Sequence, residues 1–148
     1  MVVVTDGNTI KVLENNREIR IRLAKIDCPE SSQDFGQKAK MFTSELAFGK
    51  NVKVLVKDVD HYGRSVAEII LPDGRSLNRE LIKGGLAWWY QRYSSDETLG
   101  KLQEEAKAAK FGLWSMDNPT INNRWWIGVL IALHCSLSAW IDAQTSVW

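Results

Sequence analysis

Short stretches of alternating apolar and polar residues, each ended by turn residues, constrain this chain more than any other feature. Residues 2–5 and 9–13 predict one strand interrupted by a turn, and residues 18–26 predict the strand that returns beside it. Residues 52–56 and 65–71 predict a second pair of strands. Strands this short, joined by short turns and without internal repeats, suit a small β-barrel.

Three segments have the spacing of helices instead. Residues 37–48 carry apolar side chains on one helical face, residues 77–83 form a short helix before two glycines, and residues 94–110 form a third. Ser94 with Glu97 three positions later predicts a capping box at the start of the third helix. The order β-β-β-α-β-β-α-α favours a five-stranded Greek-key β-barrel with three α-helices, an α+β fold that is mainly β.

Charge and cysteine content exclude several kinds of protein. Residues 1–124 hold 19 basic and 17 acidic side chains, a net charge of +2, which excludes binding of a polyanion by net charge alone. Any binding of nucleic acid must depend on a few well-placed basic groups. Cys28 and Cys135 lie far apart without other cysteine or histidine ligands at zinc spacing, so neither a disulfide framework nor a zinc site is predicted.

Three polar clusters carry the residue types that phosphodiester chemistry needs: Asp6-Gly7-Asn8-Thr9, residues 22–30 with a basic residue and two carboxylates around a proline, and Asp60-His61-Tyr62-Gly63-Arg64. Oxygen ligands hold hard divalent cations. Arginines bind phosphate oxygens through paired hydrogen bonds, and a nearby carboxylate orients or deprotonates water. Together the clusters predict a phosphate site.

Each cluster also has a purely structural interpretation. Asp-Gly-Asn is in most proteins only a hairpin turn, and Asp27 and Glu30 could simply flank a turn made by Pro29. Arg22 and Asp27, five residues apart, face opposite sides of a regular strand. They can share a site only if the strand bends or bulges near Asp27.

Lys53 and Lys57 alternate with the valines of the predicted strand at residues 52–56. This alternation predicts a solvated face of the sheet and not a binding track.

The order and spacing of the clusters, together with the stretches DGNTIKV, IRLAKIDCPE, FGQKAK, DHYGRSVAEI, LIKGGLAW and AKFGLWS, closely resemble the staphylococcal nuclease family over residues 2–115. The resemblance implies an OB-fold barrel and calcium-dependent hydrolysis of DNA and RNA, preferably single-stranded, with little base specificity.

The resemblance also implies roles for individual residues. Arg22 and Arg64 would clamp the phosphate, and Glu30 would act as general base or water orienter. Asp27 and the carbonyl of Cys28 would hold one calcium ion. Tyr62 and Tyr93 stand where tyrosines of the family contact the nucleotide.

Asn8 departs from the family pattern. The first cluster normally reads Asp-Gly-Asp-Thr, and its second aspartate is a calcium ligand; here that metal position is Asn8. An amide oxygen can ligate calcium but adds no charge, so we expect weakened metal binding. A working nuclease of reduced metal affinity is predicted, and the alternative is a silent OB-fold module that binds single strands or a protein partner.

The domain boundary is predicted near Asn118, with the barrel over residues 1–118 and an apolar extension over residues 119–148. Residues 125–141 carry no formal charge and favour a helix packed on the barrel or on a second subunit; a membrane anchor is the alternative. No secretory signal precedes the first strand, which predicts a cytoplasmic protein. Secretion or membrane anchoring would follow if the true start lay upstream or the extension inserted.

Overall fold

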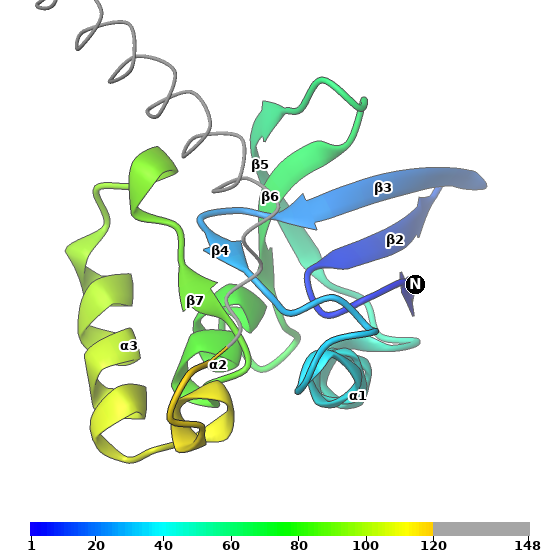
Figure 1. Ribbon diagram of the computed structural model, residues 1–148. Helices are drawn as coiled ribbons and strands as arrows, with labels where there is room; N and C mark the ends of the chain where they lie inside the picture. Colours follow the sequence, from blue (N-terminus) through cyan, green and yellow to red (C-terminus); the bar gives the residue numbers. More distant parts are fainter. Residues whose placement is uncertain (120–148) are drawn as a thin grey trace, which may run out of the picture.

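The computed structural model describes residues 1–119, in which seven short strands and three α-helices surround one core (Figure 1). Five strands form the main sheet in the order β1-β2-β3-β6-β5, and β4 pairs with β7 apart from it. The strand bounds are β1 Val2–Val4, β2 Thr9–Glu14, β3 Arg17–Leu23, β4 Ile26–Asp27, β5 Lys53–Val59, β6 Ser65–Ile70 and β7 Trp88–Trp89.

The five predicted strands and three predicted helices are present. The predicted barrel is not closed, because the hydrogen bonds between strands form an open sheet. Within the described residues, β1 and β5 are the two edges of the sheet. β1 has only three residues, and the chain beyond Leu23 leaves the sheet to pair β4 with β7. No described strand therefore joins one edge to the other. The pair β4–β7 was not predicted at all.

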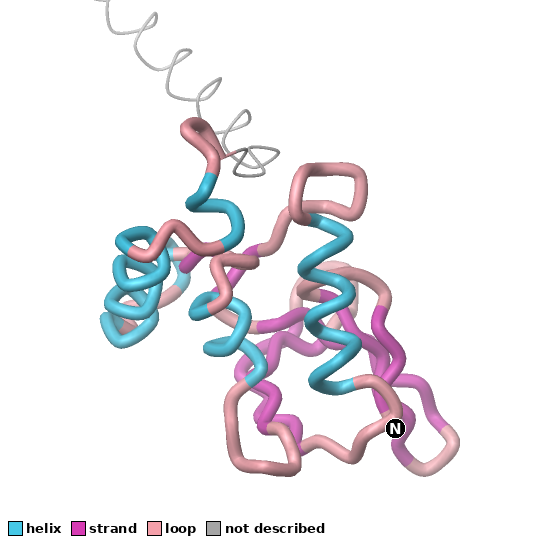
Figure 2. Tube along the Cα trace, turned by 90° about the horizontal axis from the view of Figure 1, so that it is seen from below, coloured by secondary structure: helices cyan, strands magenta, loops and turns pink. Residues whose placement is uncertain are grey.

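The helices are α1 (Gly36–Ala47), α2 (Leu77–Lys83) and α3 (Glu97–Ala108). α2 lies between α1 and α3, and the three cover one side of the strands (Figure 2). The predicted cap at Ser94 is wrong, because Asp96 is the N-cap and its carboxylate accepts the amide hydrogen of Thr98. Asp is as good an N-cap as Ser, and Ser94 instead accepts a hydrogen bond from the amide of Asp96.

The core confirms the predicted alternation in β3. Ile21 and Leu23 are buried, whereas Arg20 on the other face is exposed. These side chains pack with apolar residues of the neighbouring strands and of α2, among them Val2, Ile10, Ile69, Leu77, Leu81 and Ile82. Burial of this set supplies the main stabilisation of the domain.

Two glycines let the end of the described chain pack against the end of α2. Gly85 has a φ of +66°, and a Cβ there would overlap the carbonyl oxygen of Phe111. The amide of Leu113 donates to the carbonyl of Gly85 at 2.8 Å. The turn at Gly84-Gly85 and the segment at residues 111–114 therefore pack directly against each other.

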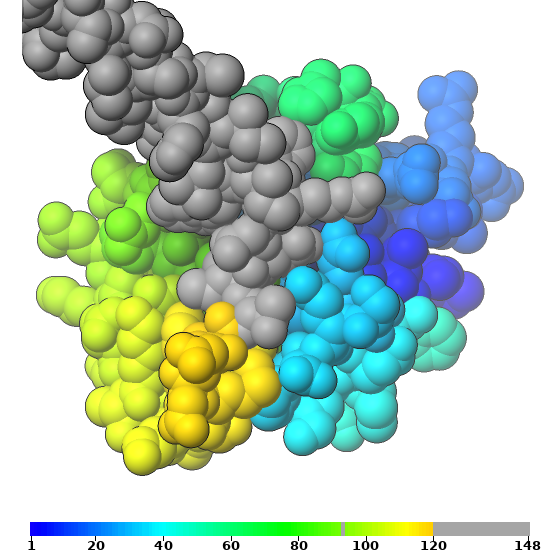
Figure 3. Space-filling model, in the orientation of Figure 1, coloured from blue at the N-terminus to red at the C-terminus, as the bar shows by residue number. Residues whose placement is uncertain are grey.

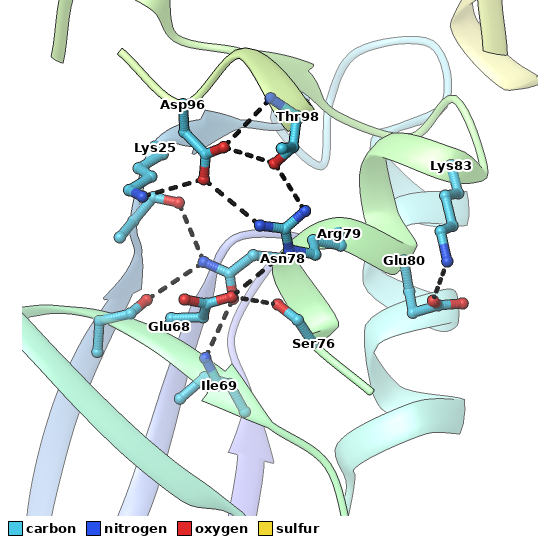
Figure 4. Close-up of polar contacts among 12 residues, drawn as sticks. Lys25, Glu68, Ile69, Ser76, Asn78, Arg79, Glu80, Lys83, Asp96 and Thr98 are labelled. Carbon is cyan, nitrogen blue, oxygen red and sulfur yellow. Dashed lines mark hydrogen bonds and ion pairs between the residues drawn. The ribbon is translucent and has the colours of Figure 1, made fainter. Parts of the chain in front are cut away.

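A polar network joins the chain after β3 to α2 and α3 (Figure 4). The Lys25 ammonium lies 3.2 Å from the carboxylate of Asp96, which also accepts from Arg79 at 3.4 Å. Asn78 donates to the carbonyl of Ala24 and accepts from the amide of Ile69. These contacts hold the turn at residues 24–25 in one position.

The end of the β2–β3 hairpin and the turn between β5 and β6 project as separate lobes (Figure 3). No helix within residues 1–119 is both long and apolar enough to span a bilayer. The apolar stretch at residues 125–141 lies outside the described residues.

Candidate functional site

The chain bends sharply between β3 and β4, and this bend brings Arg22 and Asp27 to the same side. Lys25 has a left-handed backbone conformation, with φ of +65°. The Arg22 guanidinium donates to Asp27 Oδ1 at 2.6 Å and to the carbonyl of Ile26 at 3.3 Å. The bend that the sequence required for a shared site is therefore present.

The turn between β1 and β2 carries Asn8, whose side chain reaches Asp27. The amide of Asn8 donates to the carboxylate of Asp6, which closes the turn. Gly7 packs so closely that an added Cβ would lie 2.8 Å from that of Ala39 in α1, and Thr43 of α1 donates to its carbonyl. The turn is therefore pinned against α1, and Asn8 is 8% exposed.

Asp27 is the point where two of the polar clusters meet. Its Oδ1 accepts from Arg22, from Asn8 Nδ2 at 2.7 Å and from the amide of Cys28 at 3.1 Å. Burial raises the pKa of this carboxyl above its ordinary value, although Arg22 and the hydrogen bonds lower it. Asp27 is consequently an under-solvated anion that additional positive charge would stabilise.

The third cluster forms a tight turn that holds Arg64. Asp60 accepts hydrogen bonds from the amides of Tyr62 and Arg64, both at 3.0 Å, and from Arg64 Nε at 2.7 Å. Gly63, with φ of +75°, allows the reversal. The guanidinium carbon of Arg64 also lies 5.5 Å from the centre of the Tyr62 ring.

Parallel pairing of β3 with β6 brings the two arginines to the same region. In this register Ile21 lies beside Ser65 and Arg22 beside Val66. Arg64, immediately before Ser65, is thus close to Arg22 although 42 positions separate them in the sequence. Only the end of β3 and the start of β6 overlap, and this register is what brings the two residues together.

Glu30 follows Pro29 and is exposed to solvent. Its amide donates to the side chain of Gln33 at 2.8 Å. Gly36, the first residue of α1, passes so close that a Cβ would overlap the carbonyl oxygen of Glu30. The start of α1 therefore fixes the backbone that carries this carboxylate.

These residues surround a polar cavity of about 510 Å³, the inner pocket. Its walls contain seven of the eight predicted site residues: Asn8, Arg22, Asp27, Cys28, Glu30, Tyr62 and Arg64. Asp6, Thr9 and Pro29 complete it. The eighth, Tyr93, ends a 3₁₀ turn at Gln91–Tyr93, and its side chain lies outside what the structure describes.

A second cavity of about 480 Å³, the outer pocket, shares Arg22, Asp27, Tyr62 and Arg64 with the inner one. Its remaining walls come from the bend after β3, from β5, from the turn after β5 and from Tyr90, and include Leu23, Lys25, Lys57, Asp58, Asp60, His61 and Val66. The two pockets are therefore neighbours, and both arginines line each of them.

The donor set fits a hard cation under one condition. Asp27 offers a carboxylate and Cys28 a backbone carbonyl, but Asn8 turns its nitrogen, a donor, towards Asp27. Rotating the amide by half a turn presents its oxygen instead. Within residues 1–119 no three Asp, Glu, His or Cys side chains are grouped as metal ligands. A cation here would therefore rely on neutral oxygens beside Asp27.

Two functional candidates are not identified by the sequence patterns. Asp60 was part of a recognised cluster but was given no role, although an aspartate before a glycine turn commonly binds backbone amides. Lys57 is exposed, as the alternation predicts, and it also lines the outer pocket. The position of Lys57 in the pocket wall becomes visible only from the pairing of β5 with β6.

Known proteins are similar to this chain over most of its length. Residues 20–116 match the family model described as staphylococcal nuclease homologue. An uncharacterized endonuclease of Escherichia coli O157:H7 is 40% identical over 119 residues, which cover 80% of this chain and 78% of the relative. An uncharacterized endonuclease of Haemophilus influenzae is 40% identical over 126 residues, 84% of this chain and 70% of the relative.

A protein named micrococcal nuclease from Shigella flexneri is 37% identical over 135 residues, 84% of this chain and 78% of the relative. The match to the family model includes the whole of the second and third polar clusters and ends at residue 116. The similarity to the relatives covers most of the chain. The chain belongs to the staphylococcal nuclease homologue family.

Proposed function

We propose that this chain is a nuclease that hydrolyses phosphodiester bonds of DNA and RNA, preferably single-stranded, with little base specificity. One observation carries the proposal: Arg22, Arg64 and the carboxylate-bearing residue Glu30 line the same open pocket. The endonuclease and micrococcal nuclease names of the relatives support it. Contacts to phosphate and sugar read no base sequence, which accounts for the broad specificity.

In this mechanism the scissile phosphate lies in the inner pocket between the arginines. Arg22 and Arg64 donate hydrogen bonds to its non-bridging oxygens and stabilise the charge that develops in the transition state. Glu30, exposed at the rim, orients a water molecule and accepts its proton as the oxygen attacks phosphorus in line with the leaving group. Tyr62 contacts the sugar or base beside the phosphate.

We further propose that calcium is the cofactor. Asp27, the amide oxygen of Asn8 and the carbonyl of Cys28 would hold it, and its charge would polarise the phosphate and position water. The raised pKa of Asp27 supports a site that gains from added positive charge. Asn8 supplies no charge, so metal affinity is lower than with an aspartate.

A second function is favoured by one contact. Asn8 Nδ2 donates to Asp27 Oδ1 at 2.7 Å, so the amide already satisfies the carboxylate that a metal would use. If this hydrogen bond outcompetes the cation, the domain binds single-stranded nucleic acid or a protein partner without cutting. The arginines would then serve as a phosphate clamp only.

The substitution Asn8→Asp tests which function holds. We expect the parent to cut a labelled single-stranded DNA with calcium but not with EDTA, and Asn8→Asp to need less calcium for half-maximal rate, because a second carboxylate strengthens the ligand set. The measurement is initial cleavage rate against calcium concentration. A silent parent with an active Asn8→Asp variant would establish the binding function, and silence in both would refute a nuclease.

Asp60 is proposed as the residue that positions Arg64. We expect Asp60→Ala to lower kcat about tenfold, because a guanidinium released from its carboxylate no longer points steadily at the phosphate. Asp60→Asn keeps the acceptor for the turn amides and should recover part of the rate. The measurement is kcat and KM for single-stranded DNA cleavage by the three proteins.

Asp73 offers a matched control for Asp60. Its carboxylate accepts from the amide of Arg75 at 3.0 Å and from Arg75 Nε at 2.8 Å, the same pattern, but outside both pockets. Asp73→Ala should therefore leave kcat at the parent value. If kcat fell equally in Asp60→Ala and Asp73→Ala, the loss would come from a less stable turn and not from the position of Arg64.

A further inference from the structure

The strand β5 contains an irregularity next to the outer pocket. Val56 pairs with Ala67 and Asp58 with Val66, so Lys57 between them has no partner in β6. Such a β-bulge places two residues of one strand opposite a single residue of the other and changes where side chains point. The bulge therefore interrupts the alternation at Lys57, which is exposed to solvent, as predicted.

The bulge places Lys57 in the wall of the outer pocket, together with Lys25. Lys25 comes from the bend that also assembles Arg22 and Asp27. Neither lysine lines the inner pocket, and both also line a small cavity of about 10 Å³ next to the outer one. The two lysines thus line the pocket that both arginines share with the inner one, but not the inner pocket itself.

Of the basic side chains that line the outer pocket, Arg22, Lys25 and Arg64 each form an ion pair, whereas Lys57 forms none within residues 1–119. Asp27 and Asp60 accept from Arg22 and Arg64, and Asp58 accepts from the amide of Val59 at 2.7 Å. Lys25 pairs with Asp96, which it shares with Arg79 (Figure 4). Within residues 1–119 no ion pair or hydrogen bond of the Lys57 ammonium is present.

From this geometry we infer that Lys57, supported by Lys25, binds the phosphate next to the one that is cleaved. The inference rests on the proposed function and extends it: the substrate is a chain with at least two successive phosphates, and the strand runs through both pockets. A lysine is a flexible point charge that holds a phosphate without reading the base beside it.

The test compares two substrates on the full chain. Single-stranded dT₁₂ offers flanking phosphates, whereas the dinucleotide dTpdT has only the scissile one. We expect the ratio of kcat/KM on dT₁₂ to kcat/KM on dTpdT to fall about three- to fivefold in Lys57→Ala, as for one exposed charge contact. Lys53→Ala is the matched control, because Lys53 is an exposed lysine of the same strand outside both pockets.

Binding of fluorescent dT₁₂ at several salt concentrations, measured by anisotropy in EDTA, gives a readout that does not need turnover. Loss of one phosphate contact lowers the slope of log affinity against log salt by about 0.7 for a single strand. We expect this loss in Lys57→Ala and not in Lys53→Ala. A slope equal to the parent's, or a parent that does not bind dT₁₂, overturns the inference. A parent that binds but cuts neither substrate refutes the proposed function alone.

Discussion

Replacing Glu30 by alanine or glutamine is expected to lower the rate of single-stranded DNA cleavage by about 10²- to 10⁴-fold, the usual contribution of a general base. In the proposed mechanism the neighbouring carboxylates already bind other groups, and Asp6 accepts the amide hydrogen of Asn8. Asp27 accepts three hydrogen bonds at one oxygen, and Asp60 holds Arg64. Glutamine keeps the size of the side chain and loses only the basic oxygen, so it separates chemistry from packing.

The measurement is single-turnover cleavage of labelled DNA with saturating calcium. Asp34→Ala serves as the control, because Asp34 is an exposed carboxylate of the same loop that does not line either pocket. It should cut like the parent, and both Glu30 variants should keep the parent's affinity for DNA in EDTA. A Glu30→Gln enzyme that retains a tenth of the parent rate would assign the base to another group.

Most strands and helices could be predicted because their signals are local. Alternation in β3 and the apolar spacing of α1, α2 and α3 survive in the structure within a few residues of the expected bounds. The bend near Asp27 could be stated only as a requirement. It depends on Lys25 adopting a positive φ, which lysine rarely does without tertiary support; here Asn78 binds the carbonyl of Ala24 and Asp96 pairs with Lys25.

What the sequence could not supply are pairings between distant strands. Antiparallel pairs are the commoner kind, yet β3 and β6 run parallel, and the register that sets Ile21 beside Ser65 brings Arg64 close to Arg22. The bulge at Lys57 and the small pair β4–β7 are likewise decided by register across the fold. The candidate site residues were therefore identifiable from clusters and resemblance, whereas their common pocket required the structure.

Arg22→Ala and Arg64→Ala are each expected to lower kcat by about 10²-fold or more, because both guanidinium groups are proposed to stabilise charge in the transition state. Their effects on stability should differ. Arg22 is the ion-pair partner of Asp27, whose side chain is only 14% exposed, so its removal leaves an under-solvated carboxylate. We expect Arg22→Ala to lower the free energy of unfolding by about 1–3 kcal/mol.

Asp60, the partner of Arg64, keeps two backbone donors when the guanidinium is lost, whereas Asp27 has one. The unfolding free energy of Arg64→Ala should stay within about 1 kcal/mol of the parent value. Urea unfolding and single-turnover kinetics on the same proteins check both expectations, with Arg75→Ala as a surface arginine control. If both variants fold and cut as fast as the parent, the arginines are structural. If Arg22→Ala loses activity only in proportion to its unfolded fraction, Arg64 alone stabilises the phosphate in the transition state.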